Sequence, residues 1–137
     1  MVRVIMGVKG TGKTKQMIDL IHAAVKSESG SVVCIERSNK LTYDIPHAVR
    51  LVEAKDYNIN SFEVMRGFIS GLHAGNYDIT HVFIESITKI VGADAESPRL
   101  EEFLDWLNNF GEANNIKFTL SISADAELAS DGVRKYF

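Results

Sequence analysis

The segment GVKGTGKT, residues 7–14, carries the residue types that suit phosphate binding. Glycines let the backbone curl with consecutive amide N–H groups facing inward, and such a concave nest can surround an anion. Gly7, Gly12, Lys13 and Thr14 occupy every fixed position of the pattern G-x-x-x-x-G-K-[ST]. The spacing therefore predicts a loop that binds a polyphosphate.

Two side chains of this loop have specific expected roles. Lys13 would reach the β- and γ-phosphates as a point charge, and the Thr14 hydroxyl would ligate a magnesium ion that bridges the same oxygens. The alternative is a glycine-rich turn that matches the pattern by chance. The predicted binding segment consists of Gly7, Val8, Lys9, Gly10, Thr11, Gly12, Lys13, Thr14 and Lys15.

The residues on either side of the loop favour the binding interpretation. VRVIM, residues 2–6, is apolar and β-branched enough for a buried strand. The following helical face is formed by Met17, Ile18, Ile21, Ala24 and Val25. Strand, loop and helix in this order are the context that the pattern requires.

A second candidate residue follows another apolar run. HVFIES, residues 81–86, places Glu85 directly after three apolar residues at the expected end of a strand. A carboxylate there can contact magnesium, usually through water. Glu85 could also be an ordinary polar residue where a buried strand reaches solvent.

On residues 7–14 and on Glu85 the chain resembles the P-loop NTPase superfamily, in which these segments are the Walker A and Walker B motifs. The resemblance implies ATP and Mg²⁺ as ligands, Lys13 and Glu85 as catalytic residues, and Thr14 and Glu85 as metal contacts. The whole chain also resembles small bacterial ATP-binding proteins that are sometimes labelled twitching-motility ATPases.

The residue after Glu85 leaves the catalytic assignment open. Many P-loop ATPases of the additional-strand type have a glutamate there that activates water, whereas this chain has Ser86, whose hydroxyl is a poor proton acceptor. Either Glu85 contacts the metal and the base is missing, or Glu85 is the base and the metal acid is missing. Both alternatives predict slow hydrolysis. Ser123 and Asp125 are candidates for sensing the γ-phosphate by position alone.

The pattern of apolar runs predicts an α/β fold. Strands are expected at 2–6, 32–36, 48–54 and 116–123, with a turn and then a strand within 76–86. Helices are expected at 14–29, 61–75 and 97–115, followed by a short helix or irregular tail. Strands separated by helices form a mostly parallel five-stranded sheet with helices on both faces, a three-layer sandwich. The resemblance to the RecA-like branch implies that the last strand lies between the two motif strands. Residues 1–137 are expected to form a single P-loop nucleotide-binding domain.

Two helix starts have capping signals. Asn60, with Glu63 three residues later, predicts the cap of the helix at 61–75. Ser97 as cap and Pro98 at the first helical position predict the start of the helix at 97–115. Trp106 is expected at the edge of that helix's buried stripe.

Composition excludes several classes of function. A net charge of −3 argues against a general nucleic-acid binder. A single cysteine, Cys34, lies in an apolar run and is expected to be a buried thiol, so disulfide and zinc frameworks are excluded. The four histidines have no ligand spacing and are expected in surface or cap roles. No apolar run is long enough to span a membrane, so the expected location is cytoplasmic.

Three functions remain in competition. The leading one is an ATP–Mg²⁺ binding protein with weak ATPase activity, acting as a nucleotide-dependent switch for an unidentified protein partner; the oligomeric state is open. The second is a small phosphotransferase, a nucleoside or metabolite kinase, although the six arginines are scattered along the sequence. The third is a structural subunit with a vestigial nucleotide site.

The loop at 38–48 could read a substrate or a base. Its candidate residues are Lys40, Thr42, Tyr43 and Asp44, and the alternative is a plain connection. The chain lacks the N/T-K-x-D segment with which P-loop proteins read guanine, so ATP is expected over GTP.

Overall fold

The computed structural model describes residues 1–39, 41 and 43–137. Its centre is a sheet whose strands are β1 (Val2–Gly7), β2 (Ser31–Glu36), β3 (Arg50–Glu53), β4 (Ile79–Ile84) and β5 (Lys117–Ser123). The order across the sheet is β1-β5-β4-β2-β3, and all neighbouring strands run parallel. The last strand therefore lies between the two strands that carry the predicted motifs, as expected.

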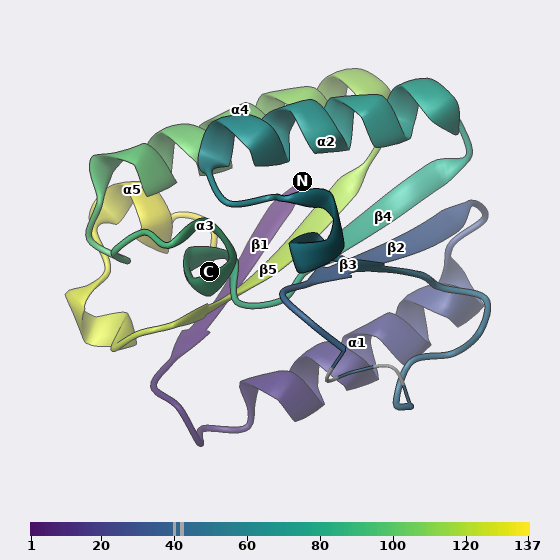
Figure 1. The fold of residues 1–137 in the computed structure, drawn as a ribbon. Helices are drawn as coiled ribbons and strands as arrows, with labels where there is room; N and C mark the ends of the chain where they lie inside the picture. Colours follow the sequence, from purple (N-terminus) through teal and green to yellow (C-terminus); the bar gives the residue numbers. More distant parts are fainter. Residues whose placement is uncertain (40, 42) are drawn as a thin grey trace.

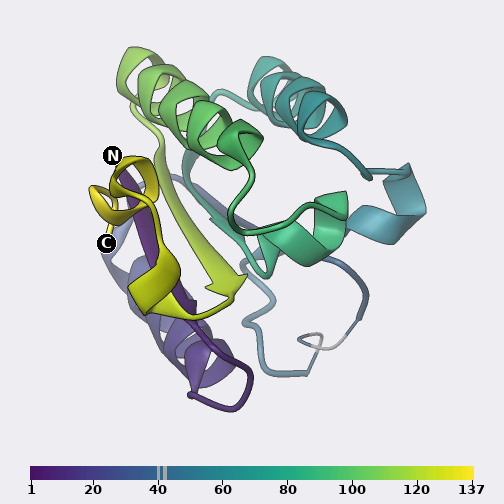
Figure 2. The same ribbon diagram turned by 90° about the vertical axis from the view of Figure 1, so that its left-hand side faces the viewer.

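Helices cover both faces of this sheet. They are α1 (Lys13–Ser27), α2 (Phe62–Gly75), α3 (Ile87–Val91), α4 (Pro98–Asn114) and α5 (Asp131–Arg134), with 3₁₀ turns η1 (Ala54–Tyr57) and η2 (Ala126–Leu128). Figure 1 shows α1 on one face and α2 and α4 side by side on the other, and Figure 2 shows the same layers after a quarter turn. The predicted α/β three-layer sandwich is confirmed. None of the helices in the described ranges has the length and apolar character needed to span a membrane.

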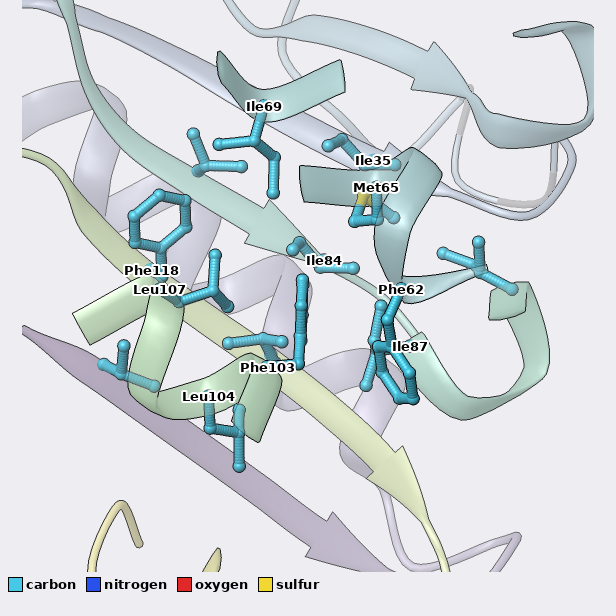
Figure 3. Close-up of a cluster of buried hydrophobic side chains, with 14 of the residues drawn as sticks. Ile35, Phe62, Met65, Ile69, Ile84, Ile87, Phe103, Leu104, Leu107 and Phe118 are labelled. Atoms are coloured by element: carbon cyan, nitrogen blue, oxygen red, sulfur yellow. The ribbon is translucent and has the colours of Figure 1, made fainter. Parts of the chain in front are cut away.

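Each face of the sheet has its own apolar cluster. The larger cluster packs β-strand side chains against α2, α3 and α4, and Figure 3 shows its centre around Ile84, Met65 and Phe103. The smaller cluster lies under α1 and includes Met17 and Cys34. Cys34 is fully buried as predicted, and burial raises the pKa of its thiol, so it remains protonated and unreactive near neutral pH.

The capping predictions have different outcomes. Ser97 caps α4 by accepting a hydrogen bond from the Arg99 amide, and Pro98 is the first helical residue, as predicted. The Asn60 cap is wrong, because Ser61 is the N-cap of α2 and its hydroxyl accepts from the Val64 amide at 3.1 Å. Serine and asparagine cap about equally well, so neighbouring candidates cannot be ranked by type alone.

Several segments differ from the predicted pattern. The strand expected at 48–54 is limited to β3, and the chain then turns into η1. The helix α3 was not predicted, because four of its five residues are buried and no polar face marks it. The C-terminal segment forms η2 and α5, and the Val4 amide donates to the Tyr136 carbonyl at 2.7 Å. This contact covers the outer edge of β1.

The register of the strands brings their carboxyl ends to one edge of the sheet. Gly7 at the end of β1 is level with Ser123 at the end of β5, and Ile84 of β4 is level with Ile35 of β2. The residues that follow these strands therefore meet at one place.

Candidate functional site

A cavity of about 590 Å³ opens at the carboxyl edge of the sheet. Four segments supply its walls: the loop after β1, the end of β2 with the residues after it, the segment after β4, and the end of β5. The lining residues are Lys9, Gly10, Gly12, Lys13, Thr14, Glu36, Arg37, Ser38, Leu41, Glu85, Ser86, Lys89 and Ser123.

Glycine conformations shape the loop between β1 and α1. Gly10 and Gly12 have φ angles of 88° and 85°. Residues other than glycine rarely adopt these positive φ values, because their Cβ atom clashes with the backbone. Gly7 leaves room for Thr11, since a Cβ at Gly7 would lie 2.7 Å from the Thr11 Oγ1. The Thr11 hydroxyl donates to the Val8 carbonyl at 2.8 Å and closes the turn. The loop therefore depends on glycine at these positions.

Lys13 begins α1 and forms part of the cavity wall. Only 8% of the residue is exposed, and its Nζ donates to the Val8 carbonyl at 3.1 Å. Burial lowers the pKa of Lys13, the charge of Lys89 lowers it further, and Glu85 opposes both effects. Charges from three segments thus act on one another across the cavity.

The predicted binding segment is only partly in the wall of the cavity. Lys9, Gly10, Gly12, Lys13 and Thr14 line it, whereas the residues that shape or flank the loop without lining it are Gly7, Val8, Thr11 and Lys15. Lys15 lies on the surface of α1 and pairs with Asp19 at 3.1 Å.

Thr14, in the first turn of α1, and Glu85, directly after β4, line the same cavity. In the described ranges, no group of three or more His, Cys, Asp or Glu side chains is arranged to hold a metal ion. Magnesium needs no such cage, because with nucleotides it keeps several waters and takes one or two protein oxygens in addition to the phosphates. The hydroxyl and carboxylate present here fit that requirement.

Ser86, directly after Glu85, has an unusual backbone. Its φ of 54° and ψ of 58° are left-handed, it is 5% exposed, and its amide donates to the buried Ser121 hydroxyl at 2.8 Å. A non-glycine residue in this region costs roughly 1–2 kcal/mol. The turn it makes separates β4 from α3 at the wall of the cavity.

Sequence reasoning missed Glu36 and Arg37. Glu36 is the last residue of β2, is 2% exposed, and its Oε2 accepts from the Leu41 amide at 3.0 Å. Both residues line the cavity, and Arg37 is the one arginine among the lining residues. The sequence pattern that pointed to Glu85 also fits Glu36, because each is a carboxylate at the end of a buried strand. Both strands end at the same edge of the sheet.

Three other positions complete the comparison with the sequence. Lys89, also missed, lines the cavity from α3, and Ser123 lines it from β5 as expected for a phosphate-sensing position. Asp125 does not line it, because its carboxylate is used to accept from the Glu127 amide at the start of η2. Position after the strand was a poor guide to where that side chain lies.

The loop after β2 borders the cavity through Ser38 and Leu41. Tyr43 is 98% exposed, and the Asp44 carbonyl oxygen lies 3.0 Å from the His22 Nε2. Lys40 and Thr42 lie outside the described residues. The role of this loop in reading a base stays a prediction.

A different group of charges lies at the amino edge of the sheet, beside a smaller cavity of about 270 Å³. Glu28 pairs with Lys117 at 2.8 Å and lies 3.7 Å from the His81 Nδ1, while the His81 Nε2 is 2.9 Å from the Thr119 hydroxyl. The surface or cap role expected for His81 is wrong, because it lies within β4, largely buried and stacked on Phe83. Burial is the main reason that its pKa falls to about 4, so the ring is neutral at pH 7.

Comparison with known proteins supports the fold. No protein-family model matches the chain, and no curated protein sequence matches it. Among solved structures, it is similar to the flagellar accessory protein FlaH from Methanocaldococcus jannaschii, with a TM-score of 0.56 and 14% sequence identity. The match covers 98% of this chain and 65% of that protein. A likeness at this identity concerns the fold alone, a parallel α/β sheet covered by helices.

Proposed function

We propose that this protein binds ATP with magnesium at the carboxyl edge of its sheet and hydrolyses it slowly, as a nucleotide-dependent switch for a protein partner. One observation carries the proposal. A complete G-x-x-x-x-G-K-T loop forms one wall of a cavity whose other walls supply Glu36 and Glu85. The likeness in fold is consistent with nucleotide binding.

Binding would use the loop and the first turn of α1. The first amide N–H groups of a helix have no partner within the helix, and α1 begins without a side-chain cap. These amides and the Lys13 ammonium would hold the phosphates, as at other helix N-termini that follow glycine-rich loops. Thr14 and Glu85 would hold the magnesium ion, which would neutralise charge on the β- and γ-phosphate oxygens.

Glu36 lies where it could act as the general base that position 86 does not supply. If Glu85 contacts the metal, Glu36 would orient the attacking water and accept its proton, since it is a carboxylate at the same cavity from a neighbouring strand. The water oxygen bonds to the γ-phosphorus, and the bond to the β–γ bridging oxygen breaks with its electron pair leaving on ADP. This assignment needs no carboxylate at the buried position 86.

A phosphotransferase remains the second candidate. Arg37 and Ser38 extend the cavity beyond the phosphate loop, where an acceptor hydroxyl could lie. ADP production that rises above a no-acceptor control when nucleosides or small metabolites are added would favour it over the switch. A vestigial site would instead leave the melting temperature unchanged by ATP or GTP.

Isothermal titration calorimetry of the purified chain tests the proposal. ATP is expected to bind with magnesium present, and chelation of magnesium should weaken binding. The absence of any heat of binding for ATP or GTP, with a folded protein by circular dichroism, would contradict it. GTP should not bind more tightly than ATP, and a tenfold tighter GTP affinity, about 1.4 kcal/mol, would overturn the expected base preference.

A further inference from the structure

Lys89 is a residue of the cavity that the two motifs do not explain. It is the one exposed position in α3, where Ile87, Thr88, Ile90 and Val91 are all buried. The four buried neighbours fix the helix against the sheet, so the side chain of Lys89 projects from a rigid support into the cavity. A lysine held in this way has a role other than covering an apolar surface.

Lys89 and Lys13 approach the cavity from different sides. Lys13 follows β1, Lys89 follows β4, and Ser123 ends β5, which lies between those two strands. The two ammonium groups are near enough for the charge of Lys89 to act on Lys13. An anion bound in the cavity would be attracted by both charges.

The charges around the cavity suit a ligand with several negative charges. Four cations line it, Lys9, Lys13, Arg37 and Lys89, against two carboxylates, Glu36 and Glu85. Within the described ranges none of the four cations forms an ion pair. Among the described residues, the two lining carboxylates are fewer than the four cations, so the wall of the cavity keeps an excess of positive charge.

We propose that Lys89 contacts the terminal phosphate of the bound nucleoside triphosphate and acts within the chain as the cation that stabilises charge on the transferring phosphoryl group. The inference rests on the proposed function. In phosphoryl transfer, negative charge is spread over the three equatorial oxygens, and a cation placed there acts mainly by positioning and electrostatics. A contact of this kind distinguishes ATP from ADP, because only ATP has the phosphate it touches.

The test compares ATP and ADP affinities by calorimetry in the wild type and in Lys89→Met. We expect ATP binding to weaken about tenfold or more and ADP binding to change less than about twofold, since only ATP has the phosphate that forms the charge-assisted contact. Lys89→Arg should restore most of the preference for ATP. Lys26→Met is the matched control, because Lys26 is exposed near the far end of α1 and should leave both affinities unchanged.

Each outcome decides one of the two proposals. Equal loss of ATP and ADP affinity, or no loss of either, would overturn the role of Lys89 while leaving nucleotide binding intact. A wild type that binds neither nucleotide would overturn the proposed function itself. Because Lys89 is exposed, the melting temperature without nucleotide should not change; if Lys89→Met fails to fold, Lys89→Gln gives the same comparison.

Discussion

The two edges of the sheet treat their charges in opposite ways. At the amino edge, Glu28 pairs with Lys117 and lies beside His81, so charge is compensated within the chain. At the carboxyl edge, Lys13 and Lys89 face a cavity and form no ion pair with any described residue. Both edges belong to the same strands, so the difference lies in the residues at the two ends of these strands and in the segments that follow them.

This difference predicts that the charged residues at the amino edge contribute to stability and that those at the carboxyl edge contribute to ligand binding. At the amino edge the Glu28 carboxylate is buried whereas Lys117 is about half exposed, so removal of Lys117 would leave a buried carboxylate without its main partner and would lower stability. Cations that line a cavity without an ion-pair partner among the described residues attract an anionic ligand, which supplies the opposite charge. Substitutions at the amino edge should therefore change stability, and substitutions at the carboxyl edge should change binding or turnover.

The largest expected effect is at Lys13. Lys13→Ala should weaken ATP binding by about 1,000-fold, or about 4 kcal/mol, because it removes the charge on the β- and γ-phosphates. The fold should persist, since the loop is closed by Thr11 and by its glycines. Calorimetry measures the affinity and circular dichroism the fold. Equal affinity in the variant would place the phosphate site elsewhere, and Lys26→Ala serves as a control.

The next effect concerns Glu36. Glu36→Gln should reduce steady-state phosphate release about 100-fold at saturating magnesium–ATP, because the amide cannot accept a proton. ATP affinity should be preserved, since glutamine can still accept from the Leu41 amide. Wild-type turnover itself should lie well below the enzyme median of about 10 per second. If Glu85→Gln stops turnover with binding intact while Glu36→Gln does not, Glu85 is the base.

The amino edge should make stability depend on pH. The folded pKa of His81, about 4, is below its ordinary value of 6.5 because of burial, with Lys117 and the N-terminal amine also lowering it and Glu28 opposing. Between these values the unfolded chain binds a proton that the folded chain does not, so stability is lost as pH falls. The pKa of Glu28 is also lowered, so protonation of this carboxylate removes further stability from the protein as the pH falls.

Urea unfolding at pH 7 and pH 5 measures this effect. The wild type should lose about 2 kcal/mol between the two values, and His81→Gln should lose much less. His47→Gln, at an exposed histidine, should behave as the wild type. An unchanged pH dependence in His81→Gln would show that another group titrates. Nucleotide affinity at pH 7 should be the same in both variants, which keeps the two edges distinct.

The smallest expected effect is at Ser86. Ser86→Gly should raise the free energy of unfolding by about 0.5 kcal/mol, because relief of the left-handed strain exceeds the extra chain entropy of glycine. Thermal melting measures it, with Ser86→Ala as the control that keeps the strain. A destabilised Ser86→Gly would indicate that the hydroxyl makes a contact worth more than the strain.

Local signals were sufficient for much of the fold. The order of strand, glycine-rich loop and helix around residues 7–14, the start of α4 at Ser97 and the buried position of Cys34 each depend on a few neighbouring residues, and each is confirmed in the structure. Phosphate binding by that loop stays a prediction. The helix α3 could not be predicted in this way, because a short helix that is buried almost all round has no amphipathic period.

Only part of the candidate site, the glycine-rich loop and Glu85, could be predicted from the sequence. Residues of the loop are consecutive in sequence, whereas Glu36 and Lys89 join them because β2 and β4 end at the same edge. These residues come together because of the order of the strands in the sheet, which cannot be deduced from the residues of one sequence alone. Asp125 shows the reverse error, since its place after β5 suggested the site but a local turn uses its carboxylate.

The pairing of β1 with β5 has a consequence for how the protein is made. The glycine-rich loop follows β1 directly, but Val2 to Gly7 pair with Phe118 to Ser123, and the Val4 amide donates to the carbonyl of Tyr136, far away in sequence. Contacts so distant in sequence are slow to form because loop closure must precede them. β1 is therefore synthesised well before its partner strand, and the cavity beside the glycine-rich loop can form only after β5 has been synthesised and paired with β1.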